Sequence, residues 1–570
     1  MPRVLEPTRR IFVFVMLVVA LVGNLSAGAR DRAGAQTPAQ ADRSPTLRLA
    51  MPAPNTLDPI LVSRFDRSAQ DLVENLFVGL TRFDPVTQTI EPAAAESWTV
   101  SEDGLTWTFT LRDDLQWVRY DTAQDQVVPV RPVVAGDFVY SVQRACDPLR
   151  PSPLTANLMV IRGCQTVAQA FPEVVNDLFI AREIGIRATS ATTLEINLLF
   201  PTSYFLTLTS TRDYRPIPRE SVGASSTWWA GSEVITNGPF ALREWSAGGA
   251  ALVRNPEWPL PVSGNVDTIR ITFADEPPLS ADYDWVALQD SRLSQAQARA
   301  PEQVRTAPEG PVVMIGFSHD RAVVDTDLGR QALARALDRG ALAEQLYGPG
   351  AEPLAQFTPP GNVAQPMWEG FQPDPARARQ ALAEAGFEGC NAIPESLLLL
   401  VPDDDPLWAQ LGETIVQQWA ATLGCSPALF EIRALPRTLM IELSHNTYDV
   451  ERVTRSHMWI ATWSADYPDG VAWINDALHC RYGYIQPGRP CSRVDNLLDR
   501  AVSSADEAER AALLAQAEEA FFGAQGSFPV VPLYVIMRGW FEQPWLTQVN
   551  EVGAARYDLW VIDPDAQPEP

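Results

Sequence analysis

The chain has 570 residues, more than a single hydrophobic core usually supports, so we expect two or more lobes. Hydrophobic residues make up 46% of it and charged residues 20%, as in ordinary soluble globular proteins. The formal net charge of −26 argues against a nucleic acid or an anionic membrane surface as partner, because both require a basic face. Lysine is absent, which excludes Schiff-base chemistry and phosphate binding by a P-loop lysine.

The N-terminus has the layout of a secretory signal peptide. Arg9 and Arg10 precede an apolar run over residues 11–22, and small residues follow. The run is too short to span a bilayer comfortably, so we predict a signal peptide and leader over residues 1–35, with an uncleaved anchor as the alternative. No cysteine stands between the run and Cys146, so a lipoprotein is not expected. The predicted location is periplasmic or cell-surface associated.

Strand and helix patterns alternate along the rest of the chain. Alternating or β-rich runs predict strands at residues 46–51, 106–111, 269–273 and 528–534. Residues 119–130 predict a long loop. Apolar spacing predicts helices over residues 328–346, 375–385, 407–423 and 506–522. This order predicts α/β lobes, with the chain returning to the first lobe after the helical block.

The cysteines predict disulfides rather than a metal site. The six are Cys146, Cys164, Cys390, Cys425, Cys480 and Cys491. An even number in an exported protein indicates a disulfide framework, but the sequence does not choose among the connectivities. Pairing of sequence neighbours would keep each bridge inside one lobe and leave hinge motion free. No pair has C-x-x-C spacing and the four histidines are scattered, so no metal or cofactor is expected.

Three consecutive motifs carry a family resemblance. ENLFVGLTRFDP begins at Glu74, PAAAESW at Pro92 and DGLTWTFTLR at Asp103. Together they resemble family 5 of the extracellular solute-binding proteins, the peptide-binding components of ABC importers. Later segments such as NGPF at Asn237 and FPVVPLY at Phe528 fit the same family.

The resemblance implies an α/β, two-lobed periplasmic-binding-protein fold of type II-like architecture, with an extra subdomain inserted in lobe I. Lobe I is expected to be discontinuous, and lobe II to be continuous. The expected boundaries are 46–80, 236–312 and 531–562 for lobe I, 81–235 for the inserted subdomain and 313–530 for lobe II. The acidic, proline-rich residues 563–570 predict a disordered tail.

The stretch WIATWSADYPDG, from Trp459, supplies the candidate ligand site. Asp466 falls on the aspartate that pairs with the ligand's α-ammonium in peptide-binding members of the family, and Trp463 and Tyr467 would flank the ligand. Taken alone, Asp466 fits a turn and Trp463 fits a core position. Oligopeptide binders commonly carry an arginine where this chain has Ile460. We therefore name Arg455, in the preceding loop, as the candidate for a ligand carboxylate, with a solvated loop as the alternative.

The resemblance implies a monomeric binding protein without catalytic residues. It would capture a peptide-like solute between its lobes and deliver it to ABC transporter permease subunits in the membrane. The alternatives are a binder of another solute (a metal chelate, haem or a sugar), a sensory surface protein and a secreted hydrolase. Neither a G-x-S-x-G nor an H-E-x-x-H motif is present, which argues against the hydrolase.

Overall fold

The computed structural model of the protein describes residues 45–568 except 151, 154, 223–226, 232, 445–454 and 486–487. Residues Ser44–Pro570 form one compact unit. The predicted signal peptide and leader, residues 1–35, lies outside the described residues. Among the helices of the described part, none has the length and apolar character needed to cross a bilayer.

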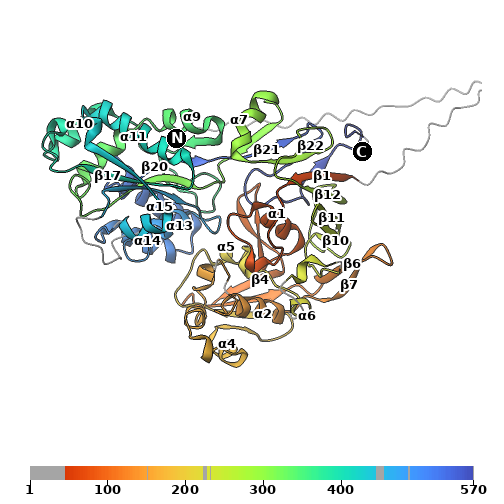
Figure 1. Ribbon diagram of the computed structural model, residues 1–570. Helices are drawn as coiled ribbons and strands as arrows, with labels where there is room; N and C mark the ends of the chain where they lie inside the picture. The colour runs from red at the N-terminus through yellow and green to blue at the C-terminus, as the bar shows by residue number, and fades with distance from the viewer. Residues whose placement is uncertain are drawn as a thin grey trace, which may run out of the picture. The chain divides into compact units, whose positions relative to one another are not determined.

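A seven-stranded sheet gathers segments that are distant in the sequence. Its order is β10-β11-β12-β1-β13-β21-β14. The strands are β1 (Thr46–Met51), β10 (Phe240–Ser246), β11 (Gly249–Arg254), β12 (Thr268–Phe273), β13 (Trp285–Leu288), β14 (Val304–Ala307) and β21 (Arg538–Glu542). β1 pairs in parallel with β12 and β13, while β21 runs antiparallel between β13 and β14. Strands from near both ends of the described chain therefore meet in this sheet. The helices α1 (Arg67–Leu76) and α7 (Asp290–Arg299) lie beside it (Figure 1).

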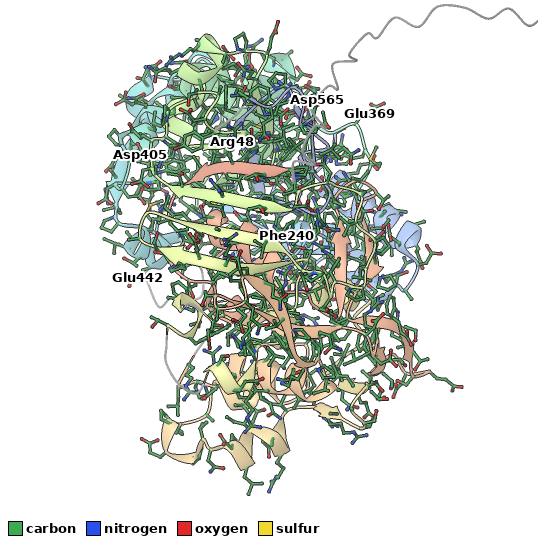
Figure 2. The ribbon with its side chains drawn as sticks, turned by 90° about the vertical axis from the view of Figure 1, so that its right-hand side faces the viewer. Arg48, Phe240, Glu369, Asp405, Glu442 and Asp565 are labelled. Carbon is green, nitrogen blue, oxygen red and sulfur yellow. A yellow bond between two sulfur atoms is a disulfide. The ribbon has the colours of Figure 1, made fainter. Side chains whose placement is uncertain are left out.

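The C-terminal residues of the described chain are tied to the first strand. Arg48 of β1 forms an ion pair with Asp284, at 2.7 Å, and Gln567 donates a hydrogen bond to the same carboxylate. Figure 2 labels Arg48 at the sheet and Asp565 above it in the same view. The disorder predicted for residues 563–570 remains a prediction. Within this segment, Gln567 is hydrogen-bonded to Asp284.

A second, six-stranded sheet has the order β16-β20-β15-β19-β17-β18. Its strands are β15 (Val312–Phe317), β16 (Ala351–Pro353), β17 (Leu397–Pro402), β18 (Phe430–Leu435), β19 (Met458–Trp463) and β20 (Val530–Ile536). Every residue of β15 is buried, as expected of a central strand covered on both faces.

Helices lie on both faces of this second sheet. Figure 1 shows α9 (Arg339–Tyr347), α10 (Pro375–Glu384) and α11 (Pro406–Leu423) on one side, and α13 (Gly470–Leu478), α14 (Arg493–Ser503) and α15 (Glu507–Phe522) on the other. The helical pattern over residues 328–346 was predicted as one segment, but it forms two helices, α8 (Asp327–Arg335) and α9. Asp338 separates them because its side chain accepts a hydrogen bond from Ala341 N and caps α9.

Smaller sheets and short helices occupy the segment between β1 and β10. The strands are β2 (Thr81–Asp84), β3 (Thr89–Pro92), β4 (Ala95–Val100), β5 (Thr106–Leu111), β6 (Gln116–Asp121), β7 (Gln126–Pro132), β8 (Ile186–Ala188) and β9 (Thr193–Asn197). The helices are α2 (Ala135–Ala145), α3 (Cys164–Ala168), α4 (Asp177–Glu183), α5 (Phe205–Thr209) and α6 (Arg219–Val222). The alternation predicted for β5 is confirmed, since Trp107, Phe109 and Leu111 are buried.

The long loop predicted over residues 119–130 is wrong, because these residues belong to the β6–β7 hairpin. Pro129 lies in β7, which within the described chain pairs in a sheet with β6 alone. Proline is tolerated there because the outer side of such a strand needs no N–H donor.

The fold confirms the expected α/β, two-lobed architecture. The lobe boundaries stay a prediction. The membership of β20 in the six-stranded sheet argues for placing the last boundary after Ile536 rather than before residue 531. The cysteines form three disulfides between sequence neighbours, Cys146–Cys164, Cys390–Cys425 and Cys480–Cys491.

Candidate functional site

A cavity of about 2110 Å³ opens between segments of the two lobes. The seven-stranded-sheet side contributes Arg64 and Phe65 from the loop before α1, and the inserted segment contributes Tyr204 and Leu208. The largest share of the wall comes from the six-stranded-sheet side, through α12 (Arg437–Ser444), β19 and the residues that follow β19. The cavity is therefore open to a ligand that touches both lobes at once.

The turn after β19 is anchored by Asp469 rather than by Asp466. Asp469 is fully buried, accepts a hydrogen bond from Val471 N at 3.0 Å and caps α13. Arg510 holds its other oxygen at 3.0 Å. Burial raises the pKa of Asp469 to about 6, although Arg510 opposes the shift. The turn is thus stabilised without help from Asp466.

Asp466 lines the cavity, and its carboxylate has few polar contacts with the rest of the protein. Its Oδ1 lies 3.2 Å from Nη1 of Arg64, which lines the same cavity from the loop before α1. The geometry of this ion pair is not that of a hydrogen bond, and Oδ1 has no hydrogen-bond partner among the described residues. The Asp466 side chain is only 13% exposed. Burial raises its pKa, and Arg64 and Arg212 partly offset that shift. A buried carboxylate without hydrogen bonds has the capacity to bind a cation.

Tyr467 and Trp463 are nearly buried and form the wall beside Asp466. The Tyr467 hydroxyl donates to Asp476 Oδ2 at 2.7 Å, and its ring stacks on Tyr204 with centroids 5.2 Å apart and an interplanar angle of 2°. Trp463 Nε1 donates to the Ala472 carbonyl at 3.1 Å. Both rings are therefore held by their own chain, and each presents part of its surface to the cavity. Asp466, Trp463 and Tyr467 thus line one cavity, and their role in binding a ligand stays a prediction.

Arg455 does not join them. It is absent from the described lining of the cavity, and its Nη1 forms an ion pair with Asp320 at 2.8 Å. Arg437, at the start of α12, does line the cavity. It is paired with Asp404 at 2.6 Å and lies over the Trp408 ring at 5.2 Å. Neither Arg437 nor Arg64 was predictable from the sequence, because each lies in a segment without a recognisable motif.

Two more carboxylates lie near this wall, Asp213 buried and Asp476 partly buried. Asp476 lines the cavity and accepts hydrogen bonds from Tyr467 and Asn475, while Asp213 accepts one from Asn157. Burial raises the pKa of each to about 6. The wall around Asp466 is therefore rich in acid groups.

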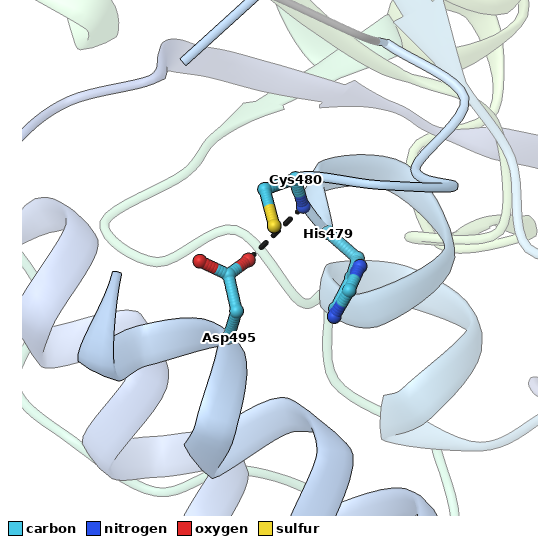
Figure 3. Close-up of side chains that lie close together, drawn as sticks. All are labelled: His479, Cys480 and Asp495. Atoms are coloured by element: carbon cyan, nitrogen blue, oxygen red, sulfur yellow. Dashed lines mark hydrogen bonds between the residues drawn. The ribbon is translucent and has the colours of Figure 1, made fainter. Parts of the chain in front are cut away.

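One further group of side chains has ligand types that suit a metal. His479, Cys480 and Asp495 lie close together at the end of α13 and the start of α14 (Figure 3). The Cys480 sulfur is bonded to Cys491, so it offers no thiolate. Asp495 is committed to Arg489 and to the Cys480 backbone N–H, at 3.0 Å. This trio is a structural cluster and does not supply a metal site.

The fold and the cavity define a two-lobed solute-binding protein. Residues 89–484 match the family model described as "Bacterial extracellular solute-binding proteins, family 5 Middle". This match covers more than half of the chain, so the protein belongs to that family.

Characterised relatives align over nearly the full length. The chain is 25% identical to the periplasmic oligopeptide-binding protein OppA of Salmonella typhimurium over 569 residues, covering 95% of each chain. It is 24% identical to the dipeptide-binding protein DppE of Bacillus subtilis over 536 residues, covering 90% of this chain and 89% of the relative. Its fold is similar to the unliganded open form of the murein tripeptide-binding protein MppA, with a TM-score of 0.77, 22% identity and coverage of 92% and 98%.

Proposed function

We propose that this protein is the substrate-binding component of an ABC importer. It takes a short peptide-like solute into the cavity between its lobes and delivers it to membrane permease subunits. The observation that carries the proposal is Asp466, a mostly buried carboxylate in the cavity wall whose Oδ1 receives no hydrogen bond from the described chain. The peptide-binding names of the relatives support the same class of ligand.

The α-ammonium of the peptide would complete the environment of Asp466. An ammonium that leaves water needs an opposed charge and good hydrogen bonds to offset the loss of hydration. Asp466 offers both, and the Arg64 guanidinium beside it is 32% exposed and therefore has room to move aside. The rings of Trp463 and Tyr467 would flank the first residues of the peptide.

For a ligand carboxylate, Arg437 replaces Arg455 in this proposal. Arg437 lies on the cavity wall, and its ion pair with Asp404 is about half exposed on both sides, so a ligand can compete for it. Arg455 keeps its partner Asp320 and has no role in binding here.

The remaining expectations follow from the same proposal. The protein is exported to the periplasm, acts as a monomer without a lipid anchor, and binds its solute without catalysis. Each disulfide joins sequence neighbours, so none restricts the closing of the lobes over a ligand.

The test compares a tripeptide with its N-acetylated form by calorimetry. The proposal expects binding of the free-amine tripeptide and a loss of roughly 100-fold or more on acetylation, since a buried carboxylate would be left unpaired. Equal affinity for the two forms would show that the amine is not recognised, and absence of binding for both would overturn peptide binding.

A further inference from the structure

A second cavity, of about 700 Å³, adjoins the first. The two share Arg64, Phe65, Asp466 and Tyr467, so they meet at the proposed ammonium site. The second cavity differs from the first in its charge, because many of its lining residues are arginines. These are Arg64, Arg67, Arg212, Arg215, Arg538 and Arg556.

Four of these arginines are neutralised by the protein itself. Arg67 and Arg538 each pair with Asp71 and Glu309, Arg215 pairs with Glu74, and Arg556 pairs with Asp558. These four guanidinium groups are therefore already engaged by carboxylates of the protein.

Arg212 differs from these four arginines because it forms no ion pair with a described residue. Its Nε donates to the Val62 carbonyl at 3.1 Å, which fixes the side chain in place. Within the described chain, its guanidinium forms no ion pair and donates no further hydrogen bond. Burial lowers the pKa of Arg212, and the nearby Asp213 and Asp466 offset only part of that effect. A guanidinium held in a cavity wall with no ion pair to a described residue and with unused donors can bind an anion.

Arg64 adds a second incompletely satisfied cation. It faces Asp466 at 3.2 Å without a hydrogen bond. At the junction of the two cavities, the guanidinium groups of Arg64 and Arg212 therefore lie near Asp466, and only Arg64 forms an ion pair with it among the described residues. Two cationic groups with donors left to use thus lie beside the carboxylate that is proposed to bind an amine.

We infer that Arg64 and Arg212 form a carboxylate subsite beside Asp466, which selects ligands carrying an acid group close to their amino end. The inference rests on the proposed function. Guanidinium groups suit this role because their planar donors match the two oxygens of a carboxylate.

The ligand class is short peptides that begin with aspartate or glutamate. The side-chain carboxylate of such a first residue lies a few bonds from its ammonium, so the two charges can reach Arg212 and Asp466 together. A free amino acid has the same pair of charges, but the larger cavity, at about 2110 Å³, has room for several residues more. The free amino acid is therefore the second source that the experiment must distinguish.

The test measures the affinities of Glu-Ala-Ala, Gln-Ala-Ala and free glutamate by calorimetry, for the wild type, Arg212→Gln and Arg64→Gln. The ratio of the two tripeptide affinities is the readout, because general damage to the site lowers both affinities alike. Wild type should prefer Glu-Ala-Ala by about tenfold or more, as expected of a charge-assisted hydrogen bond. Each variant should bring the ratio towards one. Arg182→Gln is the matched control, since the Arg182 side chain is 81% exposed and, among the described residues, forms its ion pair with its neighbour Glu183 alone.

The outcomes separate this inference from the proposed function. Equal wild-type affinities for the two tripeptides would overturn the subsite while leaving peptide binding intact. A preference that survives in both arginine variants would also overturn it. Binding of free glutamate as tightly as of Glu-Ala-Ala would overturn the assignment to peptides, and absence of binding by all three probes would overturn both proposals.

Discussion

Asp466→Asn removes the charge that should hold the ligand amine and preserves the size of the side chain. Unpairing a buried charge costs roughly 3–5 kcal/mol. The lower end applies here, because the Asp466 side chain keeps 13% exposure and Arg64 already offsets part of its charge. About 3 kcal/mol corresponds to a loss of roughly 150-fold in affinity. The fold should survive, because Asp469 rather than Asp466 anchors the turn.

The assay is a double-mutant cycle by calorimetry, with wild type and Asp466→Asn each titrated with a tripeptide and its N-acetylated form. Acetylation should cost the wild type about as much as the substitution, and should cost the variant little more, since both changes remove the same ion pair. Asp499→Asn is the matched control. Asp499 also lines the cavity, but its side chain is 53% exposed, so its loss should change the affinity by less than about threefold. Additive losses in the cycle would refute the contact between Asp466 and the amine.

Further expectations concern stability, pH and shape. Asp558→Asn should lower the free energy of unfolding by about 3–5 kcal/mol in denaturant titrations, because it leaves the buried Arg556 without its ionic partner and Arg82 with Glu74 alone; a loss under about 1 kcal/mol would contradict this. Burial raises the pKa of Asp476 to about 6, so its ionised form costs stability at pH 7 and this cost shrinks as the pH falls to 5. The stability of Asp476→Asn relative to wild type should therefore drop by about 1 kcal/mol between pH 7 and 5, and an unchanged difference would show that the pKa is ordinary. Small-angle scattering should give a smaller radius of gyration with bound tripeptide, and an unchanged radius would argue against closure.

The regular elements were largely predictable from local patterns. The alternation around Phe109 and the apolar spacing of α10, α11 and α15 depend on residues close in sequence, and the structure confirms them. The β6–β7 hairpin was missed because residues 119–126 are mostly polar and carry a loop signal, whereas the pairing of β7 with β6 is decided by tertiary structure.

The candidate site was only partly predictable. Asp466, Trp463 and Tyr467 lie in one short segment with a family motif, so the sequence could place them together. Arg64, Arg212 and Arg437 come from three distant segments, and only the folded chain brings them to the cavities around that motif. For Arg455 the sequence could not reveal the competing partner, Asp320, which is 135 positions away.

The central claim is that the cavity between the lobes binds a peptide. The most direct measurement is native mass spectrometry of the mature protein incubated with an equimolar mixture of a tripeptide, its N-acetylated form, haem, a metal chelate and a sugar. The account predicts one retained ligand, the free-amine tripeptide, which is released on denaturation. Retention of haem, the chelate or the sugar in its place would contradict the account, and so would equal retention of the acetylated peptide.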